Sequence, residues 1–176
     1  MVALCLATIF LSAWASLVMP HTWLLGATLG LGGVLLALAA IDITSFRLPD
    51  LLTLPLTAFG LAVSHWLPGR PFLNHLAGAA GGYIALAGLA WSYRRLRGRD
   101  GLGLGDAKLA AAAGAWLGWL PLPSVLLIAC AGGLLWALGG ALLRGRRTLA
   151  ERIPFGAPLC LAIWVVWLYG PLKAFG

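Results

Sequence analysis

Acidic residues are scarce in this 176-residue chain, which has 5 Asp and Glu against 12 Lys and Arg, and charged residues of both signs make up only 10% of it. Soluble domains carry about 25% charged residues. Apolar residues reach 61%, and the mean hydropathy is +0.96. This composition excludes an ordinary soluble domain. It predicts an all-α fold, a polytopic membrane bundle that forms a single integral-membrane domain over residues 1–176.

Several signatures of catalytic and structural sites are also missing. The three cysteines, Cys5, Cys130 and Cys160, form no C-x-x-C pair, so the sequence predicts neither a zinc knuckle nor a disulfide framework. No H-E-x-x-H and no G-x-S-x-G occurs, which argues against the common zinc protease and serine hydrolase motifs. We therefore predict that the protein uses no metal and no cofactor. Excess positive charge in a membrane protein reports orientation, so we predict no nucleic-acid partner.

Seven apolar stretches have the length of membrane-spanning helices. Their predicted ranges are 2–19, 22–41, 51–67, 72–92, 105–120, 123–143 and 155–172. With seven helices, ten of the 12 Lys and Arg fall on one side of the membrane, which the positive-inside rule makes cytoplasmic. The N-terminus is then cytoplasmic and the C-terminus lies outside, where His21, His65 and His75 are expected at the interface.

Two of the few carboxylates lie against apolar helices. Asp42 directly follows the stretch 22–41, and Asp106 is the second residue of the stretch 105–120. A charged side chain at the bilayer centre costs about 2.5–3.5 kcal/mol, so two of them favour a functional interpretation over simple helix ends in the headgroup layer. A pair of aspartates could serve an aspartyl protease. The alternatives are a small transporter or proton channel that uses the pair as a relay, and a non-enzymatic assembly subunit.

Glycines precede Asp106, in the segment Gly-Arg-Asp-Gly-Leu-Gly-Leu-Gly at 98–105. Glycine lets another chain approach closely, and proteases bind their substrates as extended strands that pair backbone with backbone. The segment therefore predicts a substrate-binding surface beside Asp106. It does not fit the phosphate-binding pattern G-x-x-x-x-G-K-[ST].

Three motifs resemble those of type IV prepilin peptidases, a family of GxGD intramembrane aspartyl proteases. The segment 41–50, Ile-Asp-Ile-Thr-Ser-Phe-Arg-Leu-Pro-Asp, resembles their first aspartate motif. The segment 103–109, Gly-Leu-Gly-Asp-Ala-Lys-Leu, is similar to their G-x-G-D-x-K motif, and 153–158, Ile-Pro-Phe-Gly-Ala-Pro, resembles the motif before their last helix. The three motifs occur in family order.

The resemblance implies an endopeptidase that removes the short basic leader of prepilins or pseudopilins, after a glycine and ahead of an apolar segment, at the cytoplasmic face of the bacterial inner membrane. Asp42 and Asp106 would be the catalytic pair and share one proton. The prepilin and the lipid bilayer are the expected partners, and the oligomeric state stays open. Residues assigned to substrate binding are Gly103, Gly105, Lys108, Pro154, Phe155 and Gly156.

Two further expectations concern the loops. We expect Lys108 to contact lipid phosphate or the loop near Pro154, and Asp50 to cap the helix that follows it or to receive the basic leader with Asp100 and Glu151. Larger family members carry a cytoplasmic domain between their first two helices and methylate the new N-terminus. Here only Pro20-His21-Thr22 joins those helices. The chain thus resembles the short, peptidase-only forms of tight-adherence pilus systems, without an N-terminal methyltransferase domain.

Overall fold

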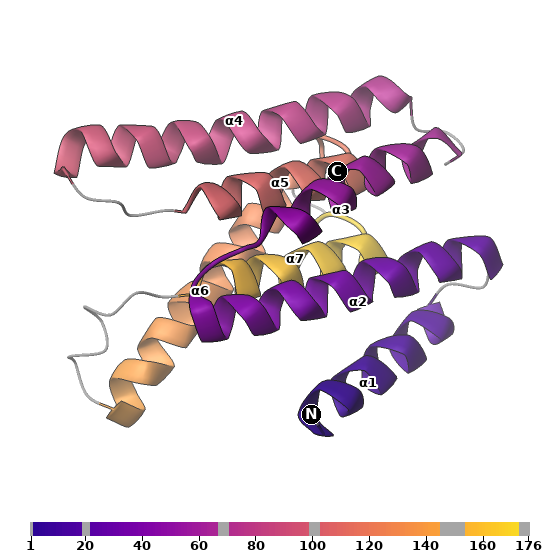
Figure 1. Cartoon of the computed structure of the whole chain (residues 1–176), viewed down its shortest axis with the longest axis horizontal. Coiled ribbons are helices and arrows are strands. Elements are labelled where there is room, and N and C mark those ends of the chain that lie inside the picture. The colour runs from indigo at the N-terminus through magenta and orange to yellow at the C-terminus, as the bar shows by residue number, and fades with distance from the viewer. Residues whose placement is uncertain (1, 19–21, 67–70, 99–102, 145–153, 173–176) are drawn as a thin grey trace.

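The structure is a computed structural model that describes residues 2–18, 22–66, 71–98, 103–144 and 154–172. Within these ranges the chain forms seven α-helices (Figure 1), as the sequence predicts. They are α1 (Val2–Val18), α2 (Thr22–Ser45), α3 (Asp50–His65), α4 (Phe72–Arg97), α5 (Leu104–Leu117), α6 (Leu122–Arg144) and α7 (Gly156–Tyr169).

Helices α2 and α4 extend four or five residues beyond their predicted C-terminal ends, and each extension has a physical reason. Helix α2 continues past Asp42 to Ser45 and ends where Phe46 adopts a left-handed conformation (φ 53°), with its N–H donating to the Asp42 carbonyl at 2.8 Å. Helix α4 continues to Arg97 and ends at Gly98, also left-handed (φ 65°). Arginines in the last turn of α4 complement the negative end of its dipole, which favours the extension. Asp42 therefore lies one turn inside α2 and not at its end.

Three helical segments are long and apolar enough to cross a membrane: Leu24–Ser45, Phe72–Arg97 and Leu122–Leu143. Helices α5 and α7 have 14 residues each and rise only about 21 Å, less than the hydrocarbon core of about 30 Å. Nevertheless they are the most buried helices, with ten buried residues apiece. In Figure 1 they lie in the middle of the molecule, between α4 and α2. The two short helices thus form the centre, and the longer helices surround them.

Helices α4 and α5 pack backbone against backbone. A Cβ atom on Gly114 would collide with the backbone of Gly78, and one on Gly82 would collide with the carbonyl of Ala110. The spacing Gly78-x-x-x-Gly82, which lets two membrane helices approach closely, marks this contact. The equivalent spacing at 26–30 does not mark such a contact, because nothing lies within 4 Å of a Cβ at either of its glycines.

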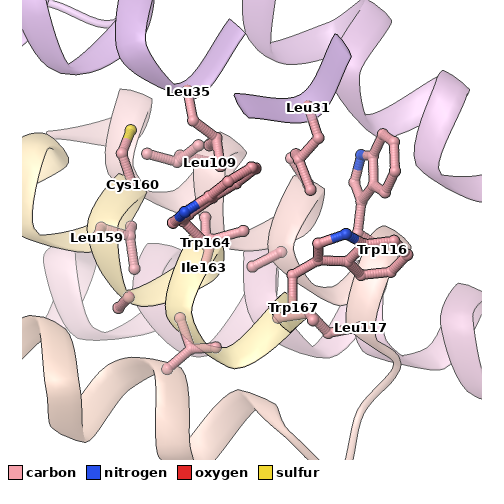
Figure 2. Packing of buried hydrophobic residues seen from close by; sticks show 14 of the residues in the cluster. Leu31, Leu35, Leu109, Trp116, Leu117, Leu159, Cys160, Ile163, Trp164 and Trp167 are labelled. Atoms are coloured by element: carbon pink, nitrogen blue, oxygen red, sulfur yellow. The ribbon is translucent and has the colours of Figure 1, made fainter. Parts of the chain in front are cut away.

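The tryptophans of α5 and α7 tie the centre to its neighbours. The rings of Trp116 and Trp167 meet edge to face with centroids 5.3 Å apart, close to Trp164 and the leucines of α2 (Figure 2). Trp116 Nε1 donates to the Leu56 carbonyl of α3 at 2.9 Å, and Trp167 Nε1 donates to Thr28 Oγ1 of α2 at 3.0 Å. The indoles of Trp116 and Trp167 therefore pack in the core while the N–H of each fixes the position of a neighbouring helix.

His75 differs from its predicted place at the membrane interface. It is fully buried on α4, and its Nδ1 lies 3.0 Å from the Ala115 carbonyl of α5. That expectation was wrong because the glycine contacts bring α5 close enough to cover the ring.

Candidate active site

Asp42 caps a helix other than its own. Its Oδ2 accepts the backbone N–H of Ala157 at 2.9 Å, and the N–H of Gly156 adds a second interaction. These are the first two residues of α7, whose N–H groups have no partner within that helix. A carboxylate satisfies them and complements the positive end of the helix dipole. These hydrogen bonds and the helix dipole explain how Asp42, only 5% exposed, is accommodated among apolar helices.

Gly156 makes this contact possible. A Cβ atom at this position would lie 2.8 Å from both Cγ and Oδ2 of Asp42 and 3.1 Å from Cδ1 of Leu48. Carbon atoms in contact are normally about 3.5–4.0 Å apart. Only glycine lets the N-terminus of α7 approach the carboxylate this closely.

Asp106 lies in the first turn of its own helix. Helix α5 begins at Leu104 after the N-cap residue Gly103, so Asp106 occupies the third helical position. From there its carboxylate reaches back to the backbone N–H of Gly103, as an acidic residue does in a capping box. Asp106 is 9% exposed. Its local sequence therefore places the carboxylate at the N-terminus of α5, as Asp42 is placed at that of α7.

Leu48 lies between the two helix N-termini. Its Cβ lies 3.0 Å from the position of a Cβ on Gly105 in α5, and its Cδ1 lies 3.1 Å from the one on Gly156 in α7. The segment after α2 thus fills the space between α5 and α7 at the level of the two aspartates. The carboxylates of Asp42 and Asp106 are near enough for their charges to repel. The pair that the sequence predicts is brought together.

Comparison with known proteins identifies the family. The model of the type IV leader peptidase family matches residues 29–138, which include both aspartates. The chain belongs to this family. A relative named prepilin leader peptidase/N-methyltransferase from Aeromonas salmonicida is 41% identical over 165 residues, which cover 94% of this chain and 56% of the relative.

Two further relatives carry the same name. The one from Pseudomonas aeruginosa is 39% identical over 166 residues, 94% of this chain and 57% of the relative. The one from Burkholderia pseudomallei is 46% identical over 130 residues, 74% of this chain and 42% of the relative. The chain spans about half the length of the curated relatives it matches. No solved structure matches it.

Lys108 of this leader peptidase family member forms an ion pair that the sequence analysis did not anticipate. Its Nζ donates to both Asp50 carboxylate oxygens at 2.6 Å. The expected contact of Lys108 with lipid phosphate or with the loop near Pro154 is therefore wrong. The expected cap is wrong as well, because Pro49 is the N-cap residue and Asp50 is the first residue of α3. The pair instead joins the start of α3 to the first turns of α5.

The residues assigned to substrate binding divide by their accessibility. Gly103 is exposed and Phe155 is half-buried, so both can be approached from outside the bundle. Gly105 packs against Leu48, and Gly156 packs against Asp42. Pro154 is buried just ahead of α7. Residues 99–102 and 145–153 lie outside the described ranges, and with them Asp100, Glu151 and part of the glycine segment.

Sequence reasoning missed two contributors to the site. Leu48 carries no chemistry, and the backbone N–H of Ala157 is invisible in a search for reactive side chains. The available signal was Gly156 at the start of an apolar helix, because a glycine there indicates that something must come close. Among the residues that the structure describes, no group of three or more His, Cys, Asp or Glu is placed to hold a metal ion.

Proposed function

We propose that this protein is an intramembrane aspartyl endopeptidase that cleaves the leader peptide of type IV prepilins or pseudopilins. The observation that carries the proposal is the convergence of Asp42 and Asp106 from two different helices onto one buried spot. Membership of the type IV leader peptidase family supports it over a transporter or an assembly subunit. The name of the relatives supports prepilin as the substrate class.

The geometry favours different roles for the two aspartates. Oδ2 of Asp42 accepts the N–H of Ala157, and the N–H of Gly156 interacts with the same carboxylate; hydrogen bonds to a carboxylate favour its charged form. We assign Asp42 as the ionised member, whose carboxylate accepts a proton from water. Asp106 then holds the proton and donates it to the carbonyl oxygen of the scissile bond as the hydroxide attacks its carbon. As the tetrahedral intermediate collapses, Asp42 passes its proton to the leaving nitrogen, and a hydroxyl of the intermediate returns a proton to Asp106 as the new carboxyl group forms, which restores the pair.

The proposed location is the bacterial inner membrane, with the carboxylate pair near the cytoplasmic face. The excess of Lys and Arg on the side that carries Asp42 and Asp106 supports this orientation. Exposed Gly103 and half-buried Phe155 border the pair and are the proposed contacts for the extended leader segment.

Carboxylate-to-amide substitutions test the proposal. Asp42→Asn and Asp106→Asn should each reduce leader cleavage by at least about 10³-fold, because neither amide can take its part in the proton exchange. The assay follows the size shift of a membrane-reconstituted prepilin on a gel. Asp50→Asn is the matched control, since Asp50 is an aspartate on the same side that pairs with Lys108 and not with the other two. We expect it to retain activity within about tenfold, because an exposed ion pair contributes little. Cleavage at the wild-type rate by either Asp42→Asn or Asp106→Asn would refute the assignment.

A further inference from the structure

An apolar groove of about 320 Å³ runs away from the carboxylate pair. Helix α7 forms its floor, with Ala157 at one end and Trp164 at the other, and α2 forms one wall from Ile43 to Gly32. The segment of α2 from Gly32 to Ile43 rises about 16 Å, roughly half the thickness of the hydrocarbon core. The groove therefore extends from the level of the aspartates to about the middle of the bilayer.

The groove is continuous with the site. Ala157 lines it and also donates its N–H to Asp42, and Ile43 is the next residue after Asp42. Cys160, another lining residue, lies one turn after Gly156 on α7. A chain bound at the aspartates would thus enter the groove without crossing any other part of the protein.

The groove opens sideways, toward lipid. Its second wall is short, formed by Gly132 and Trp136 of α6, and Leu11 of α1 adds one further lining side chain. Figure 1 shows the C-terminal end of α6 diverging from α2 and α7. Side chains at its rim are about half exposed: Trp136 at 52%, Leu161 at 56% and Ile43 at 44%. A helix already embedded in the bilayer can therefore approach by lateral diffusion.

We propose that this groove binds the apolar membrane helix that follows the scissile bond of the substrate; this inference rests on the proposed function. The groove volume is about twice that of a 150 Å³ cavity that holds benzene, so it accepts the side chains along one face of a helix and not a whole helix. An anchored helix held there keeps the bond at its cytoplasmic end beside Asp42 and Asp106, which lowers the entropic cost of positioning it. The groove thus selects precursors that are anchored in the membrane, and the two aspartates cleave them.

Photocrosslinking tests the occupant directly. The photoreactive residue p-benzoyl-phenylalanine replaces Trp136 in the groove or, as the matched control, Leu135, which is 69% exposed on the same helix but does not line the groove. Adjacent helical positions point about 100° apart at nearly the same depth. The probe is a synthetic precursor with a basic leader, a glycine and an apolar helix of about 20 residues. It is reconstituted with the photoreactive variants, which also carry Asp106→Asn so that the precursor is not cleaved. We expect crosslinking to the precursor helix at position 136 at least tenfold above that at 135.

A second measurement uses active protein, in case the photoreactive variants fold poorly. Leu36→Trp fills the groove from α2, and Leu89→Trp, at a 59% exposed position on α4, is its control. We expect Leu36→Trp to raise KM for the anchored precursor at least tenfold with kcat within threefold of wild type, and Leu89→Trp to change neither. Equal crosslinking at both positions, crosslinking to lipid alone, or an unchanged KM would overturn the groove assignment while cleavage by the wild type still stands. Crosslinking of the variant at 136 together with no cleavage by the wild type would instead refute the proposed function and leave the groove supported.

Discussion

Replacing Gly156 with alanine should impair catalysis without weakening substrate binding. The added methyl carbon would lie 2.8 Å from Asp42 Cγ, about 1 Å closer than carbon atoms in contact normally approach. Either the carboxylate moves or α7 shifts away from it. Both changes lengthen the hydrogen bond from Ala157 N–H to Asp42 Oδ2, whose N–O distance is 2.9 Å in the native protein.

The expected loss of catalytic rate can be estimated in two ways. A misplacement of about 1 Å in a catalytic group costs about 10²-fold in rate, which corresponds to about 2.7 kcal/mol. A hydrogen bond to a charged group contributes about 1.5–3 kcal/mol. Since both routes give a similar value, we expect kcat of Gly156→Ala to fall about 10²-fold with KM within threefold of wild type.

The assay is steady-state cleavage of a reconstituted prepilin, with thermal unfolding in detergent measured in parallel. Gly139→Ala is the control, because nothing lies within 4 Å of a Cβ at that position on α6. It should leave kcat unchanged and slightly raise stability, since alanine is the better helix former. If Gly156→Ala kept kcat and raised KM, Gly156 would contact substrate and would not position Asp42.

The remaining predictions concern packing, the ion pair and methyl transfer. Gly114→Ala should lower the free energy of unfolding by more than about 3 kcal/mol, measured by denaturation in detergent, because its methyl would collide with the backbone of Gly78. A double-mutant cycle on Lys108→Gln and Asp50→Asn should give a coupling below about 1 kcal/mol, since the two side chains are 29% and 56% exposed; a larger value would mean that the pair is dehydrated in the membrane. Incubation of the reconstituted protein with cleaved pilin and labelled S-adenosylmethionine should transfer no methyl group to the pilin. Labelling above a no-enzyme blank would contradict the prediction of a peptidase-only chain.

The hydropathy pattern and the helix-breaking residues were sufficient to predict the seven helices, because the length of an apolar segment and the position of a breaking residue are local properties of the sequence. Helix ends were less predictable. The end of α2 depends on a left-handed Phe46, a conformation that no sequence rule assigns to phenylalanine. The consequence is functional, because Asp42 inside the helix points its carboxylate at α7, where an aspartate beyond the helix end would have no fixed direction.

The partners of individual side chains were less accessible than the pair of aspartates itself. Scarcity of charge singled out Asp42 and Asp106, and the resemblance of their motifs placed them together. Nothing in the sequence paired Lys108 with Asp50, since they are 58 residues apart and meet only because α3 packs against α5. Likewise, the sequence indicates only that the backbone is flexible at Gly105 and Gly156. In the structure, Gly105 makes room for Leu48, and Gly156 makes room for Asp42.

The shortness of α5 and α7 connects the fold to the chemistry. A helix that spans the bilayer exposes its first N–H groups to water, but a helix of 14 residues in the centre of a bundle buries them. Those N–H groups then need acceptors, and a buried carboxylate needs donors. The aspartates meet both needs at once, Asp42 at the start of α7 and Asp106 at the start of α5. Two short central helices therefore offset the cost of holding two carboxylates together among apolar helices. Lengthening α7 by one turn ahead of Gly156 should for this reason abolish activity, even where the protein still inserts and folds.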